Sequence, residues 1–299
     1  MTNVSADPVL SQDEIDGYWR DGFVFVPDAL TADQLAALRA DFAAWVDESR
    51  AHVEPFGVTE DGRARFDLQP GHCAEHPALR RVASPVDVSE AYLSAMRDNR
   101  ALDAVTQLVG PNIEFNNSKI NAKHPGTATE VKYHQDFMFQ PHTNEDLVTC
   151  LFFLDDVTPE NGPLNVVPGT HIGPMFDHWH DGVYTGTVAP QVEAAHIDQA
   201  IPVHGPAGSA CLMHTRLLHG SAPNHSDKPR TLFISEYRAE DSKPLQVNHL
   251  PSPYDGEVVR GERTNRVRCS TYEMAYPEVP TTASFFDQQD KDGRVRRTT

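Results

Sequence analysis

The residue types best suited to chemistry in this chain are two histidines and an aspartate in its second half. His134 and Asp136 follow the β-prone run EVKY with one residue between them. A strand ending there would turn both side chains to one face and Gln135 to the other. His219 lies 85 residues downstream in another β-prone stretch. Two histidines and one carboxylate on one face of a metal leave coordination positions open, as in non-haem iron oxygenases, so we predict these three residues as catalytic metal ligands.

An arginine after the second histidine indicates what else the site binds. Arg230 stands 11 residues after His219, at the start of the β-prone run TLFISEYR. A guanidinium can hold a carboxylate by two parallel hydrogen bonds. His214 is a competing candidate for the metal, but its odd offset from His219 would put it on the opposite face of a continuous strand. We therefore expect a carboxylate ligand at Arg230 and His219 as the metal ligand.

The same ligand types leave other metal chemistry open. A zinc hydrolase could use two histidines and an aspartate to activate water, and a non-catalytic binding protein could retain such a site. Closed structural zinc sites favour four ligands with cysteine among them. The four cysteines show no paired ligand spacing and are expected to be reduced: Cys73, Cys150, Cys211 and Cys269.

The first third of the chain has helical patterns that would support such a site. Ser11 with Glu14, and Thr31 before apolar residues at helical spacing, are typical of helix starts. Further helices are expected at 88–99 and 101–110, and the run VFVPDAL is expected to form a short strand. We predict a helix-rich N-terminal buttress over about residues 10–110 that carries no chemistry.

From Asn112 the pattern changes to short β-prone runs separated by turn residues, which predicts a β-sandwich or jelly roll over about residues 111–240. The stretch 172–200 is long for a plain loop and is a candidate active-site lid. Residues 241–299 are expected to be irregular, with a frayed end at KDGRVRRTT. We expect residues 1–299 to form a single domain.

Bulk composition restricts the class of protein. Hydrophobic residues make up 39% of the chain and charged residues 23%, as in globular proteins. A formal net charge of -18 argues against a nucleic-acid partner, which needs clustered lysine and arginine. No apolar run reaches the roughly 20 residues that cross a bilayer, and the N-terminus lacks a signal pattern. We expect a cytoplasmic protein without a membrane partner; the oligomeric state stays open.

Three motifs in order resemble the phytanoyl-CoA dioxygenase-like family of Fe(II)- and 2-oxoglutarate-dependent dioxygenases. They are His134-Gln135-Asp136, DDVTPENGPLNVVPGTH at 155–171 and LLHGSAPNHSDKPR at 217–230. With the N-terminal GYWRDGFVFVPDALT, the resemblance covers roughly residues 11–240. It implies a mainly β fold with flanking helices (α+β), a double-stranded β-helix of the cupin-like jelly-roll type, in a single dioxygenase domain.

The resemblance also implies roles for particular residues. Iron would be held by His134, Asp136 and His219, and the distal carboxylate of 2-oxoglutarate by Arg230. A small hydroxyl residue two positions after the distal histidine matches Ser221. By similarity to ectoine hydroxylases, Asn121 would also touch this cosubstrate. With O2 as the second cosubstrate, the expected cofactor set is complete.

The expected reaction is hydroxylation of an unactivated C–H bond of a small metabolite, with release of succinate and CO2. Asp136 stands where the family's halogenases have a small residue, so hydroxylation is favoured over halogenation. Desaturation, cyclisation or epoxidation of a secondary-metabolite intermediate stays an alternative, because the outcome depends on how the substrate is positioned. A metal-dependent hydrolase and a non-catalytic binding protein are the remaining alternatives.

Aromatic residues near the ligand pair and in the lid candidate are expected either to line a substrate pocket or to belong to the core: Tyr133, Phe137, Phe139, Trp179 and Tyr184. The stretches HQDFMFQPHTNEDL and GPMFDHWHDGVYTG are similar to enzymes that hydroxylate 2-aminoethylphosphonate. This local similarity favours a small polar substrate.

Overall fold

The computed structural model describes residues 8–126, 129–279, 286 and 289. Its N-terminal helices start where the capping signals predict. Ser11 and Glu14 form a reciprocal capping box at the start of α1 (Gln12–Asp21), and Thr31 and Gln34 do the same for α2 (Ala32–Ser49). α3 (Glu90–Arg97) and α4 (Arg100–Val109) follow within the two stretches expected to be helical. The side chains of these caps satisfy backbone N–H groups that a helix start leaves without partners.

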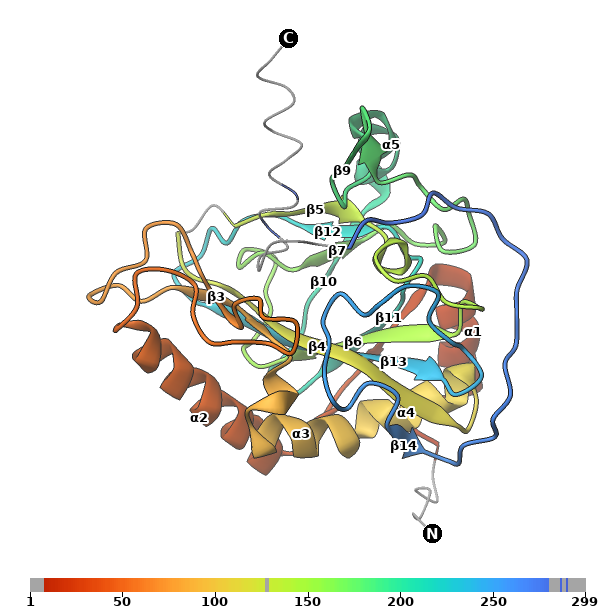
Figure 1. Ribbon diagram of the computed structural model, residues 1–299, viewed down its shortest axis with the longest axis horizontal. Helices are drawn as coiled ribbons and strands as arrows, with labels where there is room; N and C mark the ends of the chain where they lie inside the picture. Colours follow the sequence, from red (N-terminus) through yellow and green to blue (C-terminus); the bar gives the residue numbers. More distant parts are fainter. Residues whose placement is uncertain (1–7, 127–128, 280–285, 287–288, 290–299) are drawn as a thin grey trace.

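Two antiparallel sheets form a jelly roll, as expected from the strand pattern and the family resemblance (Figure 1). The larger sheet has the order β1-β11-β6-β13-β4-β3-β2, with β14 also pairing with β4. Its strands are β1 (Phe23–Val26), β2 (Phe66–Leu68), β3 (Leu79–Ala83), β4 (Ile113–Lys123), β6 (Leu147–Phe153), β11 (Ala210–His214), β13 (Arg230–Ala239) and β14 (Val258–Arg260). The smaller sheet has the order β10-β7-β12-β5, from β5 (Val131–His134), β7 (Leu164–Val166), β10 (Ile201–Val203) and β12 (His219–Ser221).

The two faces of the larger sheet have different environments, because successive side chains of a strand point to opposite faces. One face packs against the helices α2, α3 and α4, with Phe152, Phe233 and Tyr237 in the main core (Figure 1). The other face turns toward the smaller sheet and buries Leu151, Met213 and Ile234, among others. The space between the sheets is where inward-facing polar side chains of β4 and β13 must also fit.

The first third of the chain is more than a helical buttress. β1 pairs with β11, and β3 pairs with β4 in the register Arg81↔Asn121 and Ala83↔Lys119. β2 and β3 were not expected from the sequence, since their short runs contain three charged residues, Asp67, Arg80 and Arg81. They extend the larger sheet and bring Arg81 to the face that Asn121 and Lys119 occupy.

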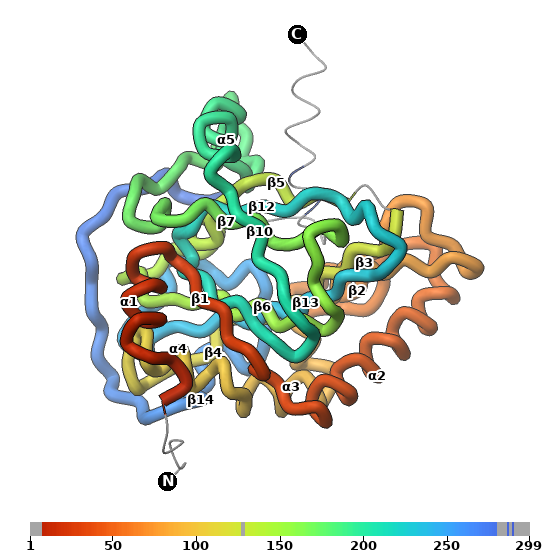
Figure 2. Tube along the Cα trace, turned by 180° about the vertical axis from the view of Figure 1, so that it is seen from behind, coloured from red at the N-terminus to blue at the C-terminus, as the bar shows by residue number. Residues whose placement is uncertain are grey.

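The lid candidate has secondary structure of its own. It contains a hairpin of β8 (Trp179–His180) and β9 (Val183–Tyr184), then α5 (Pro190–His196) and a 3₁₀ turn at Ile197–Gln199. This segment projects beyond β5 and β12 at one end of the jelly roll, as both views show (Figures 1 and 2).

After β14 the described chain has no helix or strand up to residue 279 and runs along the outside of the molecule toward the lid candidate (Figure 2). The indole N–H of Trp179 donates to the Tyr276 carbonyl, which joins the two segments. The predicted frayed end, KDGRVRRTT, lies outside the described residues. In the part of the chain that is described, no helix has both the length and the apolar character that spanning a membrane requires.

Candidate metal centre and cosubstrate pocket

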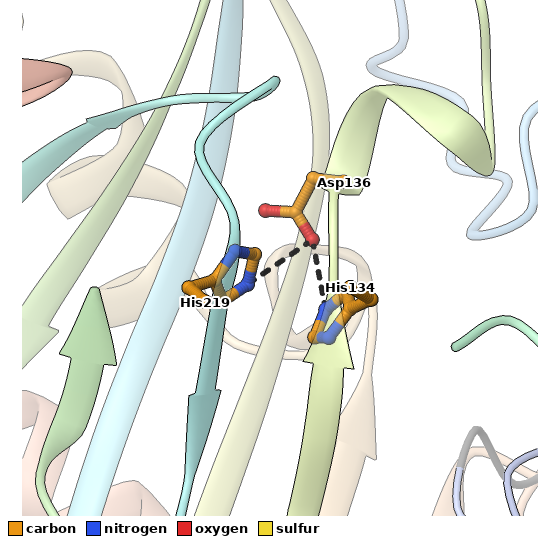
Figure 3. Close-up of side chains that lie close together, drawn as sticks. All are labelled: His134, Asp136 and His219. Carbon is orange, nitrogen blue, oxygen red and sulfur yellow. Dashed lines mark ion pairs between the residues drawn. The ribbon is translucent and has the colours of Figure 1, made fainter. Parts of the chain in front are cut away.

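The two histidines and the aspartate predicted as metal ligands lie together at the ends of β5 and β12 (Figure 3). His134 is the last residue of β5 and His219 the first of β12, and the two are directly paired across the strands. Asp136 Oδ1 lies 3.4 Å from Nε2 of His134 and 3.7 Å from Nε2 of His219. One ligand atom from each residue falls within 4.8 Å of the others. This spacing suits a single metal ion that all three residues contact from the same side.

Backbone carbonyls fix which imidazole nitrogen faces the site. Nδ1 of His134 lies 2.8 Å from the Lys132 carbonyl, and Nδ1 of His219 lies 2.9 Å from the Leu217 carbonyl. A carbonyl oxygen only accepts, so each Nδ1 carries the proton and donates. Each Nε2 therefore presents a lone pair toward Asp136, and hydrogen bonds of this kind orient ligating histidines in metal sites.

Asp136 reaches the site through a change of backbone conformation. Gln135 is extended (φ -118°, ψ 125°), but Asp136 already begins a 3₁₀ turn, Asp136–Met138. The alternation expected from the sequence holds for Gln135, whose amide group points away and donates to the Arg216 carbonyl at 2.6 Å. Its amide oxygen accepts from Phe176 N at 2.8 Å. Gln135 thus ties the ligand pair to the start of the lid candidate.

The pKa values of Asp136 and His219 are shifted in the directions that suit metal ligands. Burial alone would raise the pKa of Asp136, but the neighbouring His219, His134 and Lys119 hold it well below the usual value. Burial lowers the pKa of His219 to about 4. The Thr149 hydroxyl donates to Asp136 Oδ2 at 3.0 Å, which leaves Oδ1 for a metal. An ionised carboxylate and a neutral imidazole need not release protons to bind a metal ion.

Arg230 is the first residue of β13 and is buried at one end of the pocket between the sheets. Its Nε and Nη2 both donate to the Gly162 carbonyl, at 3.0 and 2.8 Å, which holds the guanidinium plane in place. Gly162 has φ 78°, and a Cβ there would come within 2.7 Å of the Ala222 carbonyl oxygen. The turn in NGPL therefore needs glycine in order to position Arg230.

A lysine that the sequence analysis did not single out lies beside Arg230. Lys123 pairs with Arg230 across β4 and β13, and its Nζ donates to the Ser221 hydroxyl at 2.6 Å. Burial, followed by the charge of Arg230, lowers the pKa of Lys123 to about 5. Arg230 and Ser221 line this end of the pocket, with Lys123 bonded behind Ser221 and Arg230 carrying the positive charge. We call this cluster the Arg230 end.

The pocket joins the Arg230 end to the candidate metal ligands. It has an empty volume of about 480 Å³, including the part open to solvent. Much of its lining is apolar: Leu151, Leu164, Met213, Leu232 and Ile234. The Oδ1 atom of Asn121 is buried there and has no hydrogen-bond partner among the residues that the structure describes. A cationic end, an orphan polar atom and three metal-ligand side chains fit a short dicarboxylate that also binds the metal.

The aromatic residues expected near the substrate fall into two groups. Phe139 has its ring centroid 5.7 Å from that of His134 and 6.0 Å from that of Tyr184, so both aromatic residues lie near the candidate metal ligands. Tyr133 alternates with His134 on β5 and packs instead with Val167, Val188 and Leu218.

Phe137 packs on Tyr272, with ring centroids 5.5 Å apart, and the partly buried Trp179 packs on the outer side of Tyr184. Tyr133, Phe137 and Trp179 are therefore not brought to the ligand pair. The competing histidine, His214, lies on the helix-facing side of β11 among Tyr18, Trp19 and His171.

Several residues with a role in the geometry escaped the sequence analysis, among them Thr149, Lys119 and Lys123. Lys119, Asn121 and Lys123 recur at every second position of β4. That period was a signal that all three share one face of the sheet. Thr149 carried no such signal, because its neighbours on β6 are apolar on both sides.

A jelly roll that brings two histidines and one carboxylate to one open face has the architecture of the non-haem iron oxygenases. A family model described as "Phytanoyl-CoA dioxygenase (PhyH)" matches residues 18–232. A probable alpha-ketoglutarate-dependent hypophosphite dioxygenase of Stutzerimonas stutzeri is 32% identical over 254 residues, covering 83% of this chain and 85% of that protein. The L-proline trans-4-hydroxylase of Streptomyces griseoviridis is 26% identical over 262 residues, covering 78% and 88%.

The fold is also similar to solved structures. The apo form of EctD from S. alaskensis matches with a TM-score of 0.62 at 21% identity, covering 91% of this chain and 90% of that chain. The carbocyclase SnoK from nogalamycin biosynthesis matches with a TM-score of 0.60 at 23% identity, covering 85% and 94%. The chain belongs to the phytanoyl-CoA dioxygenase family. It is an enzyme of the class that uses iron and 2-oxoglutarate, as predicted from its three motifs.

Proposed function

We propose that this enzyme hydroxylates an unactivated C–H bond of a small metabolite, with release of succinate and CO2. In this proposal His134, Asp136 and His219 hold Fe(II), and Arg230, Ser221 and Asn121, joined by Lys123, hold 2-oxoglutarate. The observation that carries the proposal is that one pocket is lined both by the three converging side chains and by the buried guanidinium of Arg230. A hydrolase would need the three ligands but not Arg230.

The chain's own residues would do three things for this reaction. Iron, 2-oxoglutarate and O2 supply the oxidising chemistry when bound. The Lys132, Leu217 and Thr149 contacts orient the ligand atoms before the metal arrives. Arg230, held by Gly162, offers its remaining N–H donors to a carboxylate. The apolar lining excludes water, which strengthens each of these charge interactions.

Hydroxylation is proposed over halogenation because Asp136 occupies the carboxylate position, and desaturation, cyclisation or epoxidation stays the alternative. Two relatives are named for dioxygenation and hydroxylation of small molecules, hypophosphite and L-proline. The carbocyclase SnoK is similar at 23% identity, a level that concerns the fold only. We also propose a cytoplasmic location, which the four free cysteines support.

Anaerobic titration of the metal-free protein with Fe(II) and then 2-oxoglutarate tests the proposal. A visible charge-transfer band is expected when the keto acid chelates iron, and the band should weaken in Arg230→Ala at a fixed 2-oxoglutarate concentration. Folded protein that binds the metal without giving a band with 2-oxoglutarate would contradict the proposal. In that case an oxygen-independent hydrolase would become the better reading of the three ligands.

A further inference from the structure

Two basic side chains share one face of the larger sheet beside the candidate metal ligands. Lys119 on β4 lines the pocket together with Asp136 and Thr149. Arg81, on β3, is buried. Directly paired residues of antiparallel strands point to the same face, so the pairings Arg81↔Asn121 and Ala83↔Lys119 place Arg81 diagonally next to Lys119. Both side chains therefore point into the space between the sheets.

These two residues lie away from the Arg230 end. Lys119 is four residues before Lys123, which corresponds to about 13 Å of strand. Its partner on β13 is Ile234, four residues after Arg230. The pocket lining thus has a basic residue at each of two levels, Arg230 on β13 and Lys119 on β4, together with the candidate metal ligands and apolar side chains. If Arg230 holds the carboxylate of the cosubstrate, the second level, at Lys119 and Arg81, is left for another ligand.

A histidine extends the second level toward the metal ligands. The Phe139 ring lies between two histidines, with centroid distances of 5.7 Å to His134 and 5.8 Å to His249. Among the described residues, Nδ1 of His249 is buried without a hydrogen-bond partner. Arg63 donates to the His249 carbonyl, which fixes this loop against the chain that precedes β2. The ring of His249 thus packs on Phe139 and lies within electrostatic reach of Lys119 and Arg81.

The charges at this level favour an anion. Burial and then the charges of Lys119 and Arg81 lower the pKa of His249 to about 3, so its ring is neutral and has one N–H to donate. Burial lowers the pKa of Lys119, Asp136 opposes that shift, and Arg81 adds to it. The nearby Glu236 carboxyl has its pKa raised to about 7, chiefly by burial, so near neutral pH it is only partly ionised. An anion between Lys119 and Arg81 would relieve their mutual repulsion.

The basic residues toward the C-terminus belong to a different part of the molecule. Arg260 pairs with Asp103, Arg263 with Glu114, and Arg268 with Asp146 and Asp241. None of these three arginines lines the pocket, so they are not candidates for a substrate contact there.

We propose that Lys119 and Arg81, with His249 beside them, form a subsite that binds an oxyanion group of the substrate next to the metal. The group would be a phosphinate, phosphonate, sulfonate or carboxylate, each of which offers several oxygen acceptors to an ammonium and a guanidinium. This inference rests on the proposed function, because it assigns the substrate class of that same site. Hypophosphite, for which one relative is named, is itself a small oxyanion.

The test measures binding of small probes to the anaerobic complex with Fe(II) and saturating 2-oxoglutarate, followed by calorimetry and by the visible band. The probes are hypophosphite, ethylphosphonate, ethanesulfonate and propionate, with propionamide as the neutral counterpart of propionate. The variants are Lys119→Met and Arg81→Met, with Arg81→Lys as the charge-retaining variant. Arg20→Met is the matched control, since Arg20 is a surface arginine paired with Asp21.

At least one oxyanion should bind more than about 10-fold tighter than propionamide, since hydrogen bonds to charged groups contribute roughly 1.5–3 kcal/mol each. Either Met variant should weaken that binding by about 10-fold or more, Arg81→Lys should restore part of it, and the 2-oxoglutarate affinity should change less than about 2-fold. Anions that bind no tighter than propionamide to the wild type would overturn the inference, as would equal losses for substrate and 2-oxoglutarate. A missing visible band in the wild type would instead overturn the proposed function.

Discussion

The two basic levels of the pocket are built in different ways. At the Arg230 end, the guanidinium is fixed by two bonds to one carbonyl and the neighbouring lysine is fixed by Ser221. At the Lys119 level, the side chains come from β3, β4 and a loop near residue 249, which are far apart in sequence. A cosubstrate common to a whole family needs a site that does not vary. A substrate that differs between members calls for a site assembled from several independent segments.

Removal of a metal ligand should affect both levels at once and gives the largest expected effect. Asp136→Ala should lower succinate formation by about 10³-fold or more, because 2-oxoglutarate and the substrate both react at the metal, which would be lost. Turnover is measured with saturating Fe(II) and 2-oxoglutarate. Asp198→Ala, at an exposed position of the 3₁₀ turn after α5, is the control and should leave turnover unchanged. Activity above a tenth of the wild-type value in Asp136→Ala would remove this residue from the ligand set.

Removal of the guanidinium should affect only the Arg230 end. Arg230→Leu should weaken 2-oxoglutarate binding by about 100-fold, since truncating one partner of a buried charge pair costs roughly 2–5 kcal/mol. Metal affinity and the preference among oxyanion probes should be retained. Anaerobic titration of the visible band gives the 2-oxoglutarate affinity. The affinity of Arg230→Lys should lie between those of the wild type and Arg230→Leu. A shift under about 3-fold would mean that another group holds the distal carboxylate.

Loss of the Thr149 hydroxyl should weaken the metal site without removing a ligand. Thr149→Val should reduce Fe(II) affinity by about 10-fold, because partners that orient metal ligands typically contribute 10- to 100-fold. Competition with a metallochromic chelator under anaerobic conditions measures this change. Thr106→Val removes a hydroxyl that bonds only to a helix carbonyl and should leave the affinity unchanged. Equal affinities in both variants would show that Oδ2 needs no donor.

The smallest expected signal is a proton taken up at the Arg230 end. Because Lys123 has a pKa of about 5 without cosubstrate, it is neutral at pH 7.5. An arriving dianion favours the ammonium form and raises this pKa. Binding should therefore take up as much as about one proton per 2-oxoglutarate. Calorimetry in buffers of different ionisation enthalpy measures the uptake, which should fall toward zero in Lys123→Met. Equal uptake in both proteins would assign the proton to another group.

The sequence was sufficient to predict the fold class and the clustering of His134, Asp136 and His219. Strand alternation holds up to Gln135, and the capping residues Ser11 and Thr31 each begin a helix. The family motifs predicted the rest of the jelly roll. The place of Arg230 at the start of a strand was also predictable, because the pattern of that strand is visible in the chain.

The second level of the pocket was not predictable because it depends on pairing between distant strands. Nothing in the run LRRVA indicates that it joins the sheet beside β4, yet that pairing brings Arg81 to Lys119. The aromatic residues expected at the substrate show the same limit. Tyr133 and Phe137 alternate away from the ligand face, while Phe139 returns to it only because the 3₁₀ turn after Gln135 changes the direction of the chain.

The direct pairing of His134 with His219 also links the cofactor to the folding of the smaller sheet. β5 and β12 are four and three residues long, and few backbone bonds hold them in register. A slip of one residue would turn one histidine to the opposite face. In the proposed function, a metal bound to both histidines is a cross-link between two strands that are distant in sequence. Iron binding would then be thermodynamically coupled to the pairing of β5 with β12, and the metal-free protein is expected to have the less stable smaller sheet.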